Sequence, residues 1–366
     1  MLGRQCLLAL CSLIFVCLVG PANSETVEVT GGMTTTAKFL DHISITVPSN
    51  VDTLTVRIPV PTDSNLFGYS QVVGDVRVVS SRTPDSTSAE TDNDGNRYDV
   101  DEFRHPASGT IIFTIFAGSA KISVDLNQPL PYSPAYLTDI PSDAAQYLKP
   151  TDKVQSDDPI IMSLANNFLA GAEDEATVAS RIQQWLQRNV TYDPAAEGGP
   201  DDALYVLSHK VAICDGWAHL FLALARADGI PARFIGGYNL GGEINYPLDT
   251  EGNSTLTVSC DDKPHSWVEV WFPGTGWVPF EPQDSAGFVD SHHLSVWAGE
   301  DADTVQSMVT WSSYDTSGQK FTLSEEEMPT KLNDHVDVSC ASTDGGPASF
   351  TTLERTRGAD SVVPNL

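Results

Sequence analysis

The sequence predicts an α+β protein in which a strand-rich N-terminal part precedes a mixed helical and strand part. Three observations predict this class. Residues 25–145 contain short strand-like runs between turn clusters, without a helical period of useful length. Helical patterns follow between residues 159 and 228. A hairpin pattern rich in aromatic and β-branched residues then covers residues 264–282.

Residues 1–24 have the features of a signal peptide. Arg4 gives a short positive start, residues 7–20 are apolar, and Ala22, Asn23 and Ser24 form a small-x-small cleavage pattern. The apolar run is short for a membrane anchor, and no later segment approaches membrane-spanning length. We therefore expect an exported protein of the extracellular space or the cell envelope, without a membrane-spanning segment in the mature chain.

The strand-like runs of residues 25–145 are typical of an immunoglobulin-like β-sandwich, which we expect to position or dock a substrate. Its loop at residues 90–101 loosely resembles a calcium loop, but strand and turn patterns flank it instead of helices. A hairpin turn at Asp94 and Gly95 is the simpler interpretation. The runs are 43–47, 54–60, 72–79, 110–117 and 122–126.

Acidic residues dominate the charge of the chain. It has 49 Asp and Glu against 20 Lys and Arg, a formal net charge of −29 at pH 7. A surface this acidic repels a phosphate backbone, so the composition argues against nucleic acid as a partner. The excess is typical of a solvated acidic surface, and it can bias substrate choice toward basic or neutral polymers.

A buried helix with a cysteine in its first turn is predicted over residues 213–228. Asp215 marks its start and Gly229 with Pro231 its end, and large apolar residues recur between them at spacings of three and four. Cys214 lies where unpaired N–H groups and the positive end of the helix dipole stabilise a thiolate. A thiolate is the nucleophilic form of cysteine, so this position predicts that Cys214 is a catalytic nucleophile.

The hairpin of residues 264–282 offers this thiol a base. His265 begins the first strand and Glu281 lies near the end of the second, so both lie at the same end of the hairpin. The side chains of His265, Trp267 and Glu269 share one face of the first strand, because strand side chains alternate.

The loop length of the hairpin decides whether Glu281 can reach His265. A three-residue loop pairs Phe272 with Gly276 and places Glu281 diagonal to His265, at roughly 7 Å. A four-residue loop would turn Glu281 to the opposite face. Asp284 would then be the alternative third residue.

These motifs resemble the transglutaminase-like superfamily of papain-like thiol enzymes, in an exported prokaryotic form with an N-terminal β domain. The resemblance covers residues 155–290 and implies a papain-like catalytic core. It implies that Cys214 is the nucleophile and His265 its base, and it implies no metal or organic cofactor. The third residue of the family is usually Asp, whereas this chain has Glu281. The matching stretches are residues 214–218, 222–226, 229–233, 265–270 and 276–280.

Other histidines are weaker candidates. His219 lies about 140° around the helix from Cys214, so we expect a core or interface role. His209 precedes the cysteine loop and is the alternative base. His292 and His293 are adjacent, but no spaced set of Cys, Asp or Glu surrounds them, so a metal site there is disfavoured.

Three cysteines remain after the predicted leader is removed: Cys214, Cys260 and Cys340. In an exported protein, three cysteines are expected to form one disulfide bridge and leave one free thiol. We expect Cys214 to be the free thiol, because its position at the start of a helix favours a nucleophile. A bridge between Cys260 and Cys340 would tie the C-terminal extension to the strand that carries His265. The alternative is that both are buried free cysteines. The extension, residues 291–366, is expected to be β-rich with a frayed tail.

The sequence therefore predicts an exported cysteine-dependent acyl-transfer enzyme that acts through a thioester on a protein or peptide substrate. The resemblance implies a protease, an amidase or a protein-glutamine acyltransferase. The alternative is a catalytically silent cell-surface binding or scaffolding protein that uses the same fold. A metal site of Cys and His is a third, weaker alternative. The oligomeric state stays open.

Overall fold

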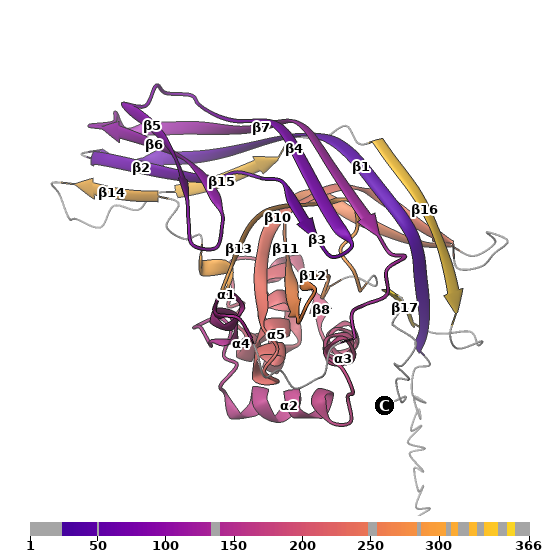
Figure 1. Cartoon of the computed structure of the whole chain (residues 1–366). Helices are drawn as coiled ribbons and strands as arrows, with labels where there is room; N and C mark the ends of the chain where they lie inside the picture. The colour runs from indigo at the N-terminus through magenta and orange to yellow at the C-terminus, as the bar shows by residue number, and fades with distance from the viewer. Residues whose placement is uncertain are drawn as a thin grey trace, which may run out of the picture.

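The computed structural model describes residues 24–49, 51–132, 140–247, 255–283, 287–304, 309–313, 322–327, 333–342 and 350–355. Two sheets form a strand-rich part, which lies above a mixed part of helices and a third sheet (Figure 1). The α+β class and the strand-rich N-terminal region predicted from the sequence are thus confirmed. The immunoglobulin-like character of that region stays a prediction.

Strand β1 is central to the larger sheet. It pairs antiparallel with β7 from Val47 opposite Gly109 to Gly32 opposite Asp125. Ile43 and Ile45 are buried, and the polar residues between them face outward, as period-two alternation requires. The described strands follow the order β15-β1-β7-β4-β3. The bounds are Ser24–Val47 for β1, Ser64–Leu66 for β3, Tyr69–Ser80 for β4 and Gly109–Asp125 for β7.

A smaller sheet adjoins it, in the order β14-β2-β6-β5. Its β5–β6 hairpin holds the loop that loosely resembles a calcium site. There, Asp92 accepts hydrogen bonds from the backbone N–H of Asp94 and Asn96 and from the Tyr98 hydroxyl. Gly95 has φ +88°, so the hairpin-turn interpretation is confirmed. The bounds are Val51–Pro59 for β2, Ser86–Thr91 for β5 and Arg97–Arg104 for β6.

The C-terminal part of the chain adds strands to both of these sheets. β15 and β16 pair antiparallel with β1, β17 pairs parallel with β1, and β14 pairs with β2. The two ends of the chain therefore share sheets, and the domain boundaries stay a prediction. The bounds are Val309–Ser313 for β14, Thr322–Glu327 for β15, Asn333–Ser342 for β16 and Phe350–Arg355 for β17.

Three helices of the mixed part, α2, α3 and α4, begin at acidic N-caps. Asp158, Asp174 and Asp202 each accept a backbone N–H from the first turn of the helix that follows. No helix in the described ranges is long and apolar enough to cross a membrane. The helices are α1 Ser142–Ala145, α2 Pro159–Leu169, α3 Glu175–Asn189, α4 Ala203–His209 and α5 Cys214–Ala227, with short 3₁₀ turns at Gln146–Leu148 and Pro194–Ala196.

Helix α5 is buried from Gly216 to Arg226, as its apolar spacing predicts. It packs on a sheet of order β12-β11-β10-β13, where the ring of Phe221 lies 6.2 Å from that of Phe280. A pair of short parallel strands, β8 and β9, precedes it. The bounds are Thr191–Tyr192 for β8, Val211–Ala212 for β9, Ala232–Pro247 for β10, Thr255–Phe272 for β11, Gly276–Phe280 for β12 and His293–Gly299 for β13.

Buried polar contacts join the strand-rich part to the sheet below it. The Tyr69 hydroxyl of β4 donates to the backbone carbonyl of His293 on β13 at 2.8 Å. The Tyr238 hydroxyl of β10 donates to Asp41 of β1 at 2.8 Å. Phe39 packs on Tyr238, with ring centroids 4.4 Å apart, and belongs to one apolar core with residues of both parts. The strand-rich part is therefore packed directly on the strands that carry the candidate site.

Candidate active site

Cys214 is the first residue of α5 and lines a cavity of about 630 Å³. It is a free thiol and half-buried. The N-cap residue, Ile213, is extended and has no side-chain acceptor, so the first turn of α5 lacks a side-chain cap. The thiol consequently lies at the positive end of a buried helix dipole.

Gly216 allows the first turn of α5 to pack closely against α4 and β9. A Cβ at this position would lie 2.7 Å from Cβ of Ala212 and 2.8 Å from Cγ2 of Val206. Side-chain atoms do not tolerate such approaches without displacement. The glycine two residues after Cys214 therefore brings the thiol end of the helix close to α4 and β9.

Both parts of the molecule line the cavity around Cys214. Ile43 and Pro59 come from the strand-rich part, whereas Tyr192, Lys263 and Trp297 come from the mixed part. The Lys263 ammonium donates to the Tyr192 hydroxyl at 3.1 Å. A molecule that reaches the thiol therefore contacts aromatic, apolar and charged groups from both parts.

His265 and Glu281 meet just beyond the last pair of the β11–β12 hairpin, Val268 and Phe280. The prediction that His265 begins its strand is wrong, because β11 starts at Thr255. Phe272 pairs with Gly276, so the hairpin has the predicted three-residue loop. Nε2 of His265 lies 2.9 Å from Oε2 of Glu281, and both side chains are buried. This contact leaves Nδ1 as the ring nitrogen available to a substrate or to the Cys214 thiol. Asp284, the alternative third residue, lies outside the described residues.

Their opposite charges stabilise the ionised forms of His265 and Glu281, although burial disfavours both. Burial disfavours the imidazolium, but the Glu281 carboxylate and a hydrogen bond with Cys214 outweigh it, and the pKa of His265 is raised well above its usual 6.5. Burial also disfavours the Glu281 carboxylate, but His265 and His293 outweigh it and lower the pKa of Glu281 to about 2. Near neutral pH the pair is therefore an imidazolium and a carboxylate.

Two polar side chains lie beside the thiol. The Ser266 hydroxyl donates to the Cys214 sulfur at 3.7 Å and also to the Asp215 carboxylate. The Cys214 thiol in turn lies 3.9 Å from Oδ1 of Asp215. Asp215, which the sequence indicates only as a helix-start residue, thus belongs to the immediate surroundings of the sulfur.

A second histidine, His293, and a second carboxylate, Asp290, extend the network. The expectation that no spaced acidic residues surround His293 is wrong, and Asp290 is not among the residues predicted from the sequence. Nε2 of His293 lies 3.2 Å from Oε2 of Glu281, and Nδ1 of His293 lies 2.8 Å from Oδ1 of Asp290. The adjacent His292 instead has its Nε2 3.2 Å from Oδ1 of Asp334. The spacing of Asp290 and His293 carries no helix or strand signature, so only the tertiary structure joins them to Glu281.

His265, Glu281 and His293 are also the described residues that could hold a metal ion, since one ligand atom of each lies within 4.8 Å of the others. The same atoms are already joined by hydrogen bonds at 2.9 and 3.2 Å. Opposite charges account for these contacts without an ion. We therefore describe the cluster as a hydrogen-bonded charge network.

The other histidines considered from the sequence lie elsewhere. His209 is exposed, and its ring stacks on Tyr205 with centroids 3.9 Å apart. His219 is fully buried, with Nδ1 2.9 Å from the carbonyl of Asp201 and Nε2 accepting the N–H of Ala302 at 3.1 Å. This is the core role expected for His219.

The expected bridge between Cys260 and Cys340 stays a prediction, because both side chains lie outside those described. The backbone places Cys260 opposite Gly242 on β10 and Cys340 opposite Val29 on β1. Cys214 remains the described cysteine with a place in the site.

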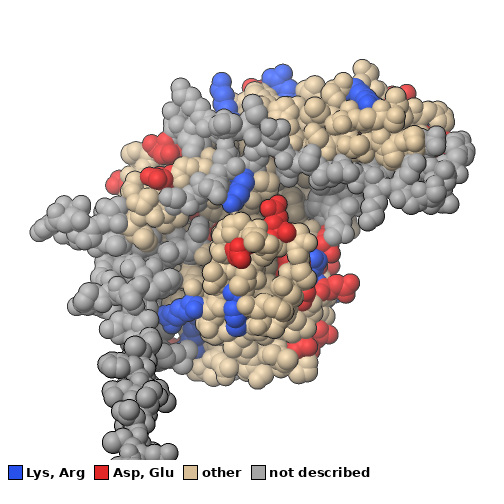
Figure 2. All heavy atoms as spheres, turned by 180° about the vertical axis from the view of Figure 1, so that it is seen from behind, with Lys and Arg blue, Asp and Glu red and all other residues tan. Residues whose placement is uncertain are grey.

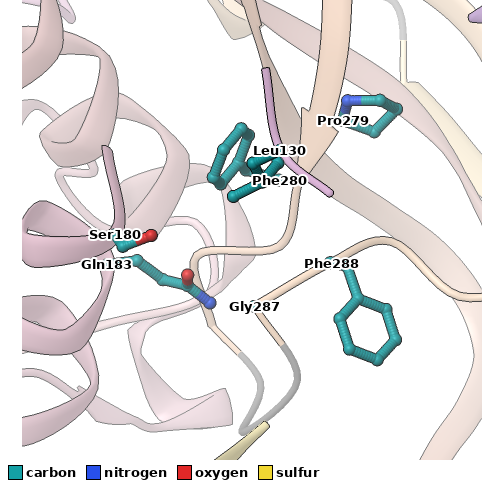
Figure 3. Close-up of a pocket in the computed structure, with 7 residues that line it drawn as sticks. All are labelled: Leu130, Ser180, Gln183, Pro279, Phe280, Gly287 and Phe288. Carbon is teal, nitrogen blue, oxygen red and sulfur yellow. The ribbon is translucent and has the colours of Figure 1, made fainter. Parts of the chain in front are cut away.

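Helix α3 fixes the backbone of Glu281. Nε2 of Gln183 donates to the Glu281 carbonyl at 2.8 Å. Figure 3 shows the Gln183 amide extending from its helix toward Gly287, next to Phe280. A Cβ on Gly287 would lie 2.6 Å from Oε1 of Gln183, so the glycine leaves room for this amide. The backbone of Glu281 is thereby tied to the helical layer.

Comparisons with known proteins agree with this geometry. The family model for the transglutaminase-like superfamily matches residues 162–282. A protein-glutamine gamma-glutamyltransferase of Pseudomonas aeruginosa is 36% identical over 117 residues, which are 31% of this chain and 16% of that protein. An uncharacterized protein of Haemophilus influenzae is 30% identical over 170 residues, 44% of this chain and 45% of that protein. The chain spans less than half the length of these relatives.

Among solved structures, a candidate cysteine protease from Cytophaga hutchinsonii is similar over most of the chain. The similarity covers 88% of this chain and 95% of that one, with a TM-score of 0.57 and 20% sequence identity. At this identity the likeness shows a shared fold, and it extends beyond residues 162–282 to the strand-rich part.

Proposed function

We propose that this chain, whose residues 162–282 match the model of the transglutaminase-like superfamily, is an exported cysteine-dependent acyl-transfer enzyme. Cys214 is the nucleophile, His265 is its base and Glu281 orients and charges the imidazole. One observation carries the proposal: a thiol at a helix N-terminus lines the same cavity as a buried imidazole whose Nε2 lies 2.9 Å from a buried carboxylate.

The reaction follows from these charges. The Cys214 thiolate attacks the carbonyl carbon of an amide, and the carbonyl oxygen takes up negative charge. The backbone N–H of Cys214 and the positive end of α5 stabilise that charge. When the C–N bond breaks, the His265 imidazolium donates its proton to the departing nitrogen. The products of this half-reaction are a thioester on Cys214 and free ammonia or an amine.

The second half-reaction releases the acyl group. Neutral His265 takes a proton from water or from an incoming amine, which attacks the thioester carbon. Water gives hydrolysis and an amine gives a new amide bond, and in either route the Cys214 thiolate leaves while His265 keeps the proton, which restores the thiolate and the imidazolium. The Glu281 carboxylate stabilises each imidazolium formed on the way. Two similar proteins, a protein-glutamine gamma-glutamyltransferase and a candidate cysteine protease, are named for activities that correspond to these two outcomes.

The setting of the site supports a protein or peptide substrate. The cavity of about 630 Å³ has walls from the strand-rich part and from the mixed part, so it can hold an extended segment next to Cys214. Export follows from the leader-like residues 1–24, and hence the reaction would take place outside the cytoplasm. Figure 2 shows acidic side chains on the described surface.

Trapping the thioester tests the proposal. The full chain is mixed with an activated peptide ester or a glutamine-containing peptide and the reaction is quenched in acid. The mass of the protein is then measured by mass spectrometry. We expect an acyl adduct on Cys214 that disappears in Cys214→Ala, together with release of ammonia, amine or alcohol. If no peptide or ester leaves an adduct or is turned over by the wild type, the catalytically silent binding protein is the better account.

A further inference from the structure

We infer that His293 and Asp290 are positioning residues for the reaction, which hold the Glu281 carboxylate ionised and aimed at His265. The inference rests on the proposed function of Cys214, His265 and Glu281. Neither residue reaches the cavity lining around the thiol, so both act through Glu281.

The geometry joins four side chains in a row. Oε2 of Glu281 lies 2.9 Å from Nε2 of His265 and 3.2 Å from Nε2 of His293. Oε1 of Glu281 accepts the backbone N–H of Gln283 at 2.8 Å. Nδ1 of His293 lies 2.8 Å from Oδ1 of Asp290. The carboxylate that serves His265 is therefore held by a second imidazole and a backbone N–H.

The protonation state of His293 follows from these contacts. Both of its ring nitrogens face carboxylate oxygens, and a neutral imidazole has one N–H, so it would turn a lone pair toward one of the two carboxylates. The imidazolium donates to both. In agreement, Asp290 and Glu281 outweigh burial and raise the pKa of His293 to about 9. His293 thus supplies a full positive charge next to Glu281.

Burial makes that charge necessary. Glu281 and His293 are each 1% exposed, and Asp290 is 2% exposed. A carboxylate in such surroundings takes up a proton unless positive charge and hydrogen bonds compensate for lost water. Along the row the charges alternate: Asp290 negative, His293 positive, Glu281 negative and His265 positive. Loss of the His293 charge leaves Glu281 with one positive neighbour instead of two.

The other groups that face this row leave its charges intact. The ring of His265 lies 5.3 Å from that of His293, and Trp267 meets His293 edge to face at 5.2 Å. Tyr69 of β4 donates to the His293 carbonyl, and burial raises its pKa, so it stays a neutral phenol. The backbone N–H of His292 donates to Oδ1 of Asp290 at 2.8 Å and helps to keep that carboxylate charged.

The test uses the full chain and the rate at which iodoacetamide labels Cys214, measured from acid to neutral pH. We compare the wild type with His293→Gln and Asp290→Asn, which keep size and polarity but remove charge. The matched control is His292→Gln, since His292 is just as buried and lies against Asp334 instead of Glu281. Melting curves show which variants fold.

We expect labelling of Cys214 near neutral pH to slow by about 10-fold in His293→Gln and Asp290→Asn, because Glu281 then takes up a proton more readily and no longer stabilises the His265 imidazolium beside the thiol. The His292→Gln profile should match the wild type. Superposition of the His293→Gln and wild-type profiles overturns the inference, provided that His265→Ala does change the profile. If His265→Ala also changes nothing, the proposed function itself fails.

A second measurement needs no folded variant of His293. The wild type is labelled with ¹⁵N-histidine, and the signals of His265 and His292 are identified as those lost in His265→Ala and His292→Gln. We expect a further buried imidazole, that of His293, to remain doubly protonated at pH 7.5. A neutral His293 ring at this pH overturns the inference. So does a stoichiometric metal ion in the purified chain whose removal changes the His293 signals, because a ligated ring nitrogen cannot carry a proton.

Discussion

Nε2 of His265 lies 2.9 Å from Oε2 of Glu281, across the open end of a hairpin whose three-residue loop sets the register of both. The relationship depends on that loop, because one more residue would turn Glu281 to the opposite face of the sheet. It also shows that a Glu can reach His265 from a position where the resemblance implies an Asp. Glu281 follows the last residue of β12, and Gln183 holds its carbonyl.

Removing the charge of Glu281 should slow acyl transfer without unfolding the protein. Glu281→Gln keeps the shape of the side chain but no longer stabilises the imidazolium of His265. We expect kcat/KM for peptide turnover to fall by about 100-fold. Glu281→Asp is the informative partner, since it restores the charge but shortens the reach by one methylene. An activity of Glu281→Gln equal to that of the wild type would contradict the assigned role.

The buried charge row should make stability depend on pH at both ends. The pKa of Glu281 is about 2 when folded against an ordinary 4.5, so its contribution is present above pH 4.5 and is lost as pH falls toward 2. The pKa of His293 is about 9 against 6.5, so its contribution is complete below pH 6.5 and is lost as pH rises through 9. The free energy of unfolding should therefore be highest between these limits.

Urea unfolding at a series of pH values measures this dependence. In His293→Gln the loss of stability on the alkaline side should become smaller, while His265 keeps part of it, because the pKa of His265 is also raised. An alkaline slope identical to that of the wild type would show that His293 is not charged in the folded protein.

The contact between the strand-rich part and β13 should contribute to stability. Tyr69→Phe removes the hydroxyl that donates to the His293 carbonyl and contacts Oε1 of Gln71 at 2.9 Å. Because both acceptors are buried, we expect the free energy of unfolding to fall by about 1 to 3 kcal/mol. Tyr132→Phe is the matched control, since Tyr132 is 60% exposed. Equal unfolding free energies for the two variants would show that the contact does not contribute to stability.

Gly216 should tolerate no side chain without movement of α5. Gly216→Ala brings a methyl group to 2.7 Å from Cβ of Ala212, so the start of the helix must shift. We expect a loss of about 1 to 3 kcal/mol in unfolding free energy and slower labelling of Cys214. Ala212→Gly in the same chain should restore part of both. Failure of this second change to restore either would mean that the contact with Ala212 does not limit the helix.

The sequence predicts the parts of the site that depend on local pattern. Cys214 opens a helix whose apolar spacing is visible in the sequence. The hairpin sequence leaves two loop lengths open, and the structure has the three-residue loop that brings Glu281 to His265. Asp290 and His293 escape such reasoning because no periodicity connects them to Glu281. Their loop must fold back before the contacts exist.

The pairing of the chain ends could not be predicted for a similar physical reason. β15, β16 and β17 pair with β1 across about 300 residues of sequence, and strand pairing at that separation has no local signal. Weak alternation in residues 291–366 indicates strands but not their partners. The contacts of Tyr69 and Tyr238 between the two parts likewise become visible only in the folded chain.

The most direct test of the central claim is the pH dependence of iodoacetamide labelling at Cys214 in the wild type and in His265→Ala. If a thiolate and an imidazolium form the reactive pair, the wild type labels rapidly well below pH ~8, where ordinary thiols are protonated, and His265→Ala loses this advantage. Slow labelling of the wild type at acid pH, with the same profile in His265→Ala, would contradict the pair and with it the proposed enzyme.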